Sequence, residues 1–193
     1  MKLVILGGPG AGKGTQAQPL CHHLGISEIS TSNILREAIA CSSDLGREAQ
    51  IYVEKGELVP DPLLIEFMRT RLVQPDAANG WLLEGYPRTA FQAEELDFLL
   101  DDLGQQLDWA IYLQVSESVM MSRSLGRCPL QGIASSGSRL DDQPEIIQRR
   151  INLFYERTIP MLEYYSYRQH LLTINADQSP QQVQQEILQK LNR

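Results

Sequence analysis

The sequence is poor in the features that mark membrane and secreted proteins. None of its apolar runs approaches the ~20 residues that a membrane-spanning helix needs. The first apolar run, MKLVIL, is too short for a secretory signal before Gly7. Only three cysteines occur, Cys21, Cys41 and Cys128, and they lack the paired spacing of a disulfide framework or a zinc site. We therefore expect a cytoplasmic protein without a membrane segment or structural zinc.

Positively charged residues are also scarce, and among them lysine is much rarer than arginine. The net charge is −7, which argues against a nucleic-acid partner held by a positive surface. Of the 17 basic residues, 13 are arginine and 4 are lysine. Because the planar guanidinium group suits bidentate contacts with phosphate or carboxylate, this bias favours a small, highly charged anionic ligand.

Short apolar runs alternate with helical patterns along the chain. The runs that predict buried strands are Leu3–Leu6, Glu28–Thr31, Trp81–Leu83, Trp109–Val115 and Leu171–Ile174. Asp61 as N-cap before Pro62, and Ser179 before Pro180, predict two helix starts. Pro19 and Pro160 lie inside helical patterns, and each should kink or break its helix. The alternation predicts an α/β fold, a doubly wound parallel sheet flanked by helices, with ligands at the carboxyl ends of the strands.

The first apolar run leads directly into a glycine-rich stretch, within LVILGGPGAGKGTQAQ (residues 3–18). Nine successive positions there hold five glycines, namely Gly7, Gly8, Gly10, Gly12 and Gly14. Bare backbone of this kind lets N–H groups approach a polyanion, and the following helix adds its positive end. Lys13 would reach the terminal phosphates, and Thr15 offers a hydroxyl. A glycine turn without a ligand is the alternative, but the lysine and the strand–loop–helix context favour a phosphate-binding loop.

Four sequence blocks carry a family resemblance. GGPGAGKGTQ resembles a phosphate loop in which G-K-G-T replaces G-K-[ST], and ISTSNILR (29–36) resembles S-T-G-D-x-L-R. LLEGYPRTAFQ (82–92) resembles D-G-[FY]-P-R-[TS]-x-x-Q, and SRLDD (138–142) resembles [GS]-R-x-D-D. The four blocks occur along the chain in the same order as in nucleoside-monophosphate kinases. Among these kinases, the sequence most closely resembles the adenylate kinase family in its short-lid form.

The resemblance implies a reversible, Mg²⁺-dependent transfer of the terminal phosphoryl group of ATP to AMP, giving two ADP. It implies one P-loop kinase domain over residues 1–193, with a five-stranded sheet and two mobile segments. These are a pair of AMP-binding helices near 30–59 and a short lid near 126–140. ATP, AMP and ADP are the expected partners, and a monomer is the expected state.

The resemblance also assigns roles to individual residues. The implied catalytic residues are Lys13, Arg88, Arg123, Arg127, Arg139 and Arg150. The implied ATP-binding residues are Gly10, Ala11, Gly12, Lys13, Gly14, Thr15, Arg127 and Gln178. The implied AMP-binding residues are Thr31, Arg36, Glu57, Leu58, Val59, Gly85, Tyr86, Pro87, Arg88, Gln92, Arg139 and Arg150. The amide of Gln92 suits the adenine edge because it offers one donor and one acceptor side. Arg149 is expected on a solvated helix face.

Three positions depart from the family pattern, and the first, Ser32, stands where the family has Gly. Glu84 stands where the family has Asp, a carboxylate that orients water on Mg²⁺; we expect Glu84 to act through water, since Mg²⁺ keeps most of its water shell. Asn33 replaces another Asp and is expected to cap the helix that carries Arg36.

Three alternatives stay open on the sequence. A UMP/CMP kinase would share the loop and the arginines, although Thr31, Thr89 and Gln92 favour adenine. An NTP-hydrolysing switch would need a guanine-reading N-K-x-D segment, which this sequence lacks. A pseudoenzyme that binds nucleotide without turnover is compatible with Glu84.

Overall fold

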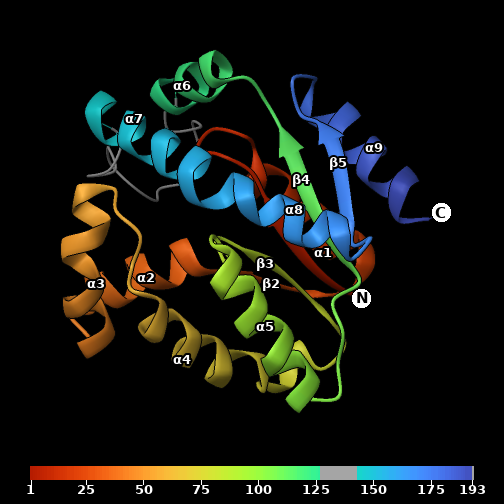
Figure 1. The fold of residues 1–193 in the computed structure, drawn as a ribbon, viewed down its shortest axis with the longest axis horizontal. Coiled ribbons are helices and arrows are strands. Elements are labelled where there is room, and N and C mark those ends of the chain that lie inside the picture. The colour runs from red at the N-terminus through yellow and green to blue at the C-terminus, as the bar shows by residue number, and fades with distance from the viewer. Residues whose placement is uncertain (127–142, 193) are drawn as a thin grey trace.

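The computed structural model describes residues 1–126 and 143–192. Its centre is a sheet of five parallel strands in the order β2-β3-β1-β4-β5. The strands are β1 (Lys2–Leu6), β2 (Ser27–Ser30), β3 (Trp81–Glu84), β4 (Trp109–Gln114) and β5 (Leu171–Asn175) (Figure 1). The predicted parallel α/β sheet is therefore confirmed. Thr31, predicted as the end of a strand, is instead the first residue of a helix, and Ser30, which is still extended, occupies the N-cap position.

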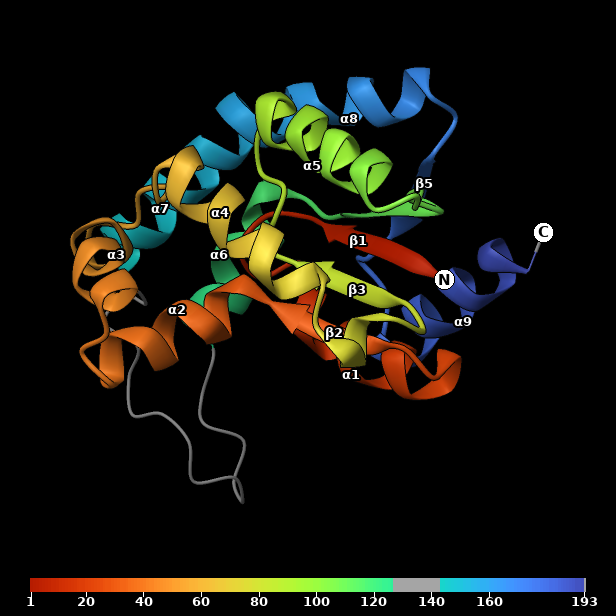
Figure 2. The same cartoon turned by 90° about the horizontal axis from the view of Figure 1, so that it is seen from below.

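Helices cover both faces of this sheet. The helices of the described residues are α1 (Lys13–Leu24), α2 (Thr31–Ala40), α3 (Asp44–Lys55), α4 (Asp61–Leu72), α5 (Ala90–Asp102), α6 (Glu117–Leu125), α7 (Pro144–Leu153), α8 (Ile159–Tyr167) and α9 (Pro180–Leu191). One face carries α5 and α8, and the opposite face carries α1 and α9 (Figure 2). The helices α2 and α3 lie beside the sheet, at one end of the molecule. We call residues 31–59, which hold α2, α3 and the segment after them, the helical arm.

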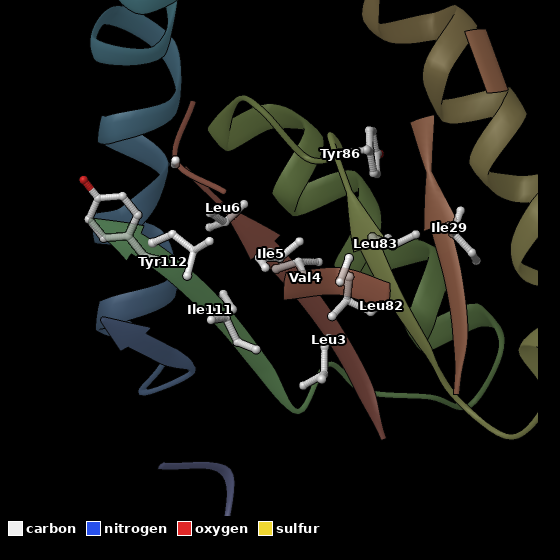
Figure 3. Packing of buried hydrophobic residues seen from close by; sticks show 14 of the residues in the cluster. Leu3, Val4, Ile5, Leu6, Ile29, Leu82, Leu83, Tyr86, Ile111 and Tyr112 are labelled. Atoms are coloured by element: carbon white, nitrogen blue, oxygen red, sulfur yellow. The ribbon is translucent and has the colours of Figure 1, made fainter. Parts of the chain in front are cut away.

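The three inner strands, β3, β1 and β4, are mostly buried because helices lie over both of their faces. Leu3, Val4 and Ile5 of β1, the central strand, are each at most 1% exposed. Leu82 and Leu83 of β3 are fully buried beside them, as Figure 3 shows. Burying one such side chain stabilises the fold by roughly 1.5–3 kcal/mol, so uninterrupted apolar runs in these strands hold the sheet in place.

Two of the predicted helix signals need correction. Asp61 is not an N-cap: it is the first residue of α4 after Pro60, and its carboxylate accepts a hydrogen bond from Gln92 instead of capping the backbone. Pro19 does not break α1, which runs through it because Ala17 and Leu20 anchor the helix in the core on both sides of the proline.

The other two proline signals agree with the structure. Ser179 caps α9 in a reciprocal capping box with Gln182, and Pro180 lies in the first turn. Pro160 lies in the first turn of α8, directly after one π-helical stretch at Phe154–Thr158, where the regular helix is interrupted. No helix in the described part of the chain is long and apolar enough to span a bilayer.

Candidate active site

The glycine-rich loop lies between the carboxyl end of β1 and the start of α1. Gly12 precedes α1 in a left-handed conformation, and within the described residues no side chain caps this helix. Gly10 is also left-handed, at φ 72°, and a Cβ there would lie 2.5 Å from the carbonyl oxygen of Met120. Only glycine fits at such a position. The loop thus presents bare backbone at the positive end of a helix, as an anion site requires.

Lys13 folds back over this loop. Its Nζ donates hydrogen bonds to the carbonyl oxygens of Gly7, at 2.7 Å, and Gly8, at 3.0 Å. The ammonium group is therefore held at the loop, with one positive charge next to the amide groups. A bound polyphosphate at this place would meet both kinds of donor.

Two adjoining hollows open beside the loop. The loop hollow is lined by Ile5, Leu6, Gly7, Gly8, Pro9, Lys13, Gly56, Leu58, Gly85, Pro87, Arg88, Arg150, Leu153, Phe154 and Thr158. The arm hollow is lined by Thr31, Ser32, Leu35, Arg36, Val53, Gly56, Glu57, Leu58, Val59, Leu64, Gly85, Arg88, Gln92 and Arg150. Among the residues that the structure describes, two charged ones, Arg88 and Arg150, line both hollows. The two hollows therefore meet at a pair of guanidinium groups.

Arg88 is placed by the turn that follows β3. Its Nε donates to the carbonyl oxygen of Gly85 at 2.7 Å, and its NH2 group donates to Ser32 Oγ at 3.3 Å. Gly85 has a φ of 87°, and a Cβ there would lie 2.3 Å from Thr31 Oγ1. Because glycine allows this close approach, the ends of β2 and β3 meet, and Arg88 lies between them and the arm.

Gln92, near the start of α5, is wholly buried. Its Nε2 donates to Asp61 Oδ1 at 2.6 Å, and its Oε1 accepts from the backbone N–H of Arg88 at 2.7 Å. Its backbone is also fixed, since its N–H donates to Thr89 Oγ1 and its carbonyl accepts from Tyr86 Oη. The side-chain amide of Gln92 is therefore held in place where it lines the arm hollow. The apolar side chains of Leu35, Val53 and Leu64 line the same hollow.

Glu84 ends β3 opposite Ser30 of β2, whose hydroxyl donates to Glu84 Oε2 at 2.8 Å. Both carboxylate oxygens lie 4.0 Å from the place of a Cβ on Gly14, so they face the start of α1. Burial, and then the negative charge of Glu84, raises the pKa of Glu28. Among residues 1–126 and 143–192, no three His, Cys, Asp or Glu side chains lie together as a metal cluster. One carboxylate beside a phosphate loop does suit a hydrated Mg²⁺, which takes few protein ligands.

The structure brings most of the predicted AMP-binding residues together. Those that line the arm hollow are Thr31, Arg36, Glu57, Leu58, Val59, Gly85, Arg88, Gln92 and Arg150. Pro87 lines the loop hollow instead, and Tyr86 lines neither because its ring is buried in the core. Asn33 is not a cap: it lies inside α2, and its Oδ1 accepts from Arg36 at 2.8 Å, which positions that guanidinium.

Other predicted residues lie outside the two hollows. Arg123, on α6, donates to the carbonyl oxygen of Ala176 at 2.9 Å. Gln178 donates to Asn175 O and to Glu186, so both predicted residues contact the turn after β5. Arg127, Arg139 and the predicted lid beyond Gly126 lie outside the described residues. Arg149 is exposed, as expected, and contacts Glu57 at 3.4 Å.

Several lining residues were not foreseen. Leu35, Val53 and Ser32 line the arm hollow, and Phe154 and Thr158 line the loop hollow. The apolar ones among them look the same in sequence whether they face a core or a ligand. For Ser32 and Leu35, the one indication of a place in the site was that both lie within the sequence block that resembles S-T-G-D-x-L-R.

A further hollow lies near the amino ends of β4 and β5, lined among others by Glu94, Asp97, Asp101 and Arg168. Arg168 is already close to Asp97, with 3.6 Å between Nε and Oδ2. The excess of carboxylates would repel phosphate. This hollow is therefore unsuited to a nucleotide, whereas the two hollows at the carboxyl ends of the strands are lined by cations.

Comparison with known proteins agrees with this geometry. Residues 5–170 match the family model described as adenylate kinase. The chain is 65% identical to adenylate kinase 2 of Nostoc sp., over 99% of this chain and 98% of that protein. It is 55% identical to adenylate kinase 2 of Synechocystis sp., over 99% of this chain and all of that protein. It is 38% identical to an adenylate kinase of Gloeobacter violaceus, over 98% of both chains. The chain therefore belongs to the adenylate kinase family of phosphotransferases.

Proposed function

We propose that this chain catalyses ATP + AMP ⇌ 2 ADP, with ATP phosphates in the loop hollow and AMP in the arm hollow. The observation that carries the proposal is the pair Arg88 and Arg150, which lines both hollows. Phosphates bound from the two sides would meet at these guanidinium groups. Such an arrangement suits phosphoryl transfer between two nucleotides better than hydrolysis of one.

The reaction asks the protein for charge neutralisation and alignment. The acceptor is already an anionic phosphate, so no general base is needed. Lys13 and the loop amides would hold the donor phosphates, and Arg36 and Arg88 the AMP phosphate. Arg150 would neutralise the group in transit, since preorganised cations stabilise the charge that develops in the transition state. The proposed roles of Arg123 as a catalytic residue, of Arg127 and Gln178 on the ATP side, and of Arg139 on the AMP side complete this set.

Glu84 would hold Mg²⁺ through water, beside Gly14 and the loop. When bound, the ion supplies positive charge to the phosphate oxygens. Closure of residues 30–59 and 126–140 over the hollows would exclude water, which otherwise competes with AMP as acceptor.

The proposal can be tested by replacing each of two neighbouring arginines with alanine. Arg150 lines both hollows, whereas Arg149 lines neither and is exposed on the same helix. In a coupled assay of ADP formation, Arg150→Ala should lower kcat by about 10²–10³-fold, the usual effect of a lost transition-state donor. Arg149→Ala should stay within a factor of about two, as a surface change does. Equal effects of the two changes would contradict the proposed site.

The nucleotide specificity is tested with the unchanged protein. AMP should be phosphorylated much faster than CMP at equal concentration. Faster turnover of CMP would identify a UMP/CMP kinase, and nucleotide binding without any ADP formation would identify a pseudoenzyme.

A further inference from the structure

Gln92 is fixed by two groups of opposite hydrogen-bonding character. Asp61 Oδ1 can only accept, and it lies 2.6 Å from Gln92 Nε2. The N–H of Arg88 can only donate, and it lies 2.7 Å from Gln92 Oε1. A rotation of the amide by 180° would place oxygen against the carboxylate and NH₂ against the N–H. Both contacts would then be repulsive, so the amide has one orientation.

Burial strengthens this constraint. The side chain of Gln92 is 0% exposed, so water does not compete for its two hydrogen bonds. Each polar atom still has capacity for one more partner, because the NH₂ group has a second N–H and the oxygen a second lone pair. Gln92 lines the arm hollow, and a purine base in that hollow can use this remaining capacity.

The orientation of the amide has a direct chemical consequence. Adenine presents an acceptor at N1 beside a donor at the 6-amino group, whereas hypoxanthine presents a donor at N1 beside an acceptor at the 6-oxo group. An amide that can rotate pairs with either edge. An amide held in one orientation pairs with one edge and opposes the other with two like groups.

We propose that Asp61 is a positioning residue that sets the choice between 6-amino and 6-oxo purine nucleotides by fixing the orientation of the Gln92 amide. This inference rests on the proposed function, since it takes the arm hollow as the AMP site. Asp61 reaches Gln92 from the first turn of α4, the helix that follows the helical arm. Its action is therefore indirect, through Gln92.

Two variants separate the hydrogen bond from the charge. Asp61→Ala removes the acceptor and the charge, whereas Asp61→Asn removes the charge but keeps an acceptor oxygen. Any effect of the carboxylate on the dipole of α4 is lost in both, so their difference reports the hydrogen bond to Gln92. Asp44→Ala serves as a control, since Asp44 is likewise in the first turn of its helix, α3, but is exposed and pairs with Arg47.

The measurement is calorimetric titration of each variant with AMP and with IMP, without ATP. The wild-type chain should bind AMP at least about a hundredfold more tightly than IMP. Asp61→Ala should lower this ratio about tenfold, the loss expected for one hydrogen bond, while Asp61→Asn and Asp44→Ala retain most of it. Asp61→Ala should have no further effect on the ratio in a Gln92→Ala background, because the two residues act through one contact.

A purely structural role for Asp61 would weaken AMP and IMP equally, and an unchanged ratio in Asp61→Ala would overturn the inference. Failure of the proposed function would look different. In that case the wild-type chain would form no ADP from ATP and AMP in a separate turnover assay, whatever the binding ratio.

Discussion

Replacing Arg88 by alanine removes a guanidinium group from the place where the two hollows join. A lost transition-state donor of this kind costs about 10²–10³-fold in rate, or about 2.7–4 kcal/mol. Arg88→Lys restores the charge but not the planar fork that donates to Gly85 O, so we expect it to recover only part of the activity. The fold should survive. A hydrogen bond such as those the side chain donates to Gly85 and Ser32 is worth about 1 kcal/mol, against a usual stability of about 5–15 kcal/mol.

The assay couples ADP formation to a spectroscopic signal and yields kcat and the KM for AMP. Thermal unfolding followed by circular dichroism reports the fold. Arg69→Ala is a matched control, because Arg69 lies exposed on α4, 3.8 Å from Asp102, and lines neither hollow. Activity of Arg88→Ala within a factor of about two of the wild type would refute the assignment of Arg88 to the site, and with it the junction of the two hollows as the reaction centre.

Two further predictions concern the phosphate loop and the thiols. Gly10→Ala should lower the free energy of unfolding in urea by about 1–3 kcal/mol more than Gly12→Ala, because both residues are left-handed but only the first would place a Cβ 2.5 Å from Met120 O; equal losses would show that crowding is unimportant. Burial raises the pKa of Cys21 from 9.0 to about 12, so iodoacetamide at pH 8.5 should alkylate exposed Cys41 at least about tenfold faster, as read by peptide mass mapping. The unfolded chain releases the Cys21 proton near pH 9 and the folded chain only near 12. The free energy of unfolding should therefore fall as pH rises through this window, by at most about 1.4 kcal/mol per pH unit from this group. A rise in stability over that range, or equal alkylation rates, would contradict this.

The strands were the most predictable part of the fold. The apolar run Leu3–Leu6 predicted β1 because a strand covered on both faces must be apolar at every position. Two of the errors concern side chains that could cap a helix but bond elsewhere. Asp61 accepts from Gln92, 31 residues along the chain, and Asn33 accepts from Arg36, one turn away in the same helix. The local sequence does not decide between a cap and these other partners, because the same side-chain oxygen can serve either.

The site was predictable where the chemistry requires particular residue types. The glycines of the loop, Lys13 and Arg88 stand out because few other residues could replace them. The apolar lining did not stand out. Val53 and Phe154 line the hollows, but each could equally have been a core residue, and only the packing of the helices decides between these roles.

The central claim is that two nucleotides are held with their phosphates meeting at Arg88 and Arg150. Calorimetric titration with diadenosine pentaphosphate, a mimic of both substrates joined through their phosphates, tests it most directly. We expect one mimic per chain, binding at least about a hundredfold more tightly than ATP or AMP alone, because the second half binds at high effective concentration. The mimic should also displace both nucleotides. An affinity no greater than that of ATP, or AMP that still binds beside the mimic, would show that the two nucleotides are not held with their phosphates together.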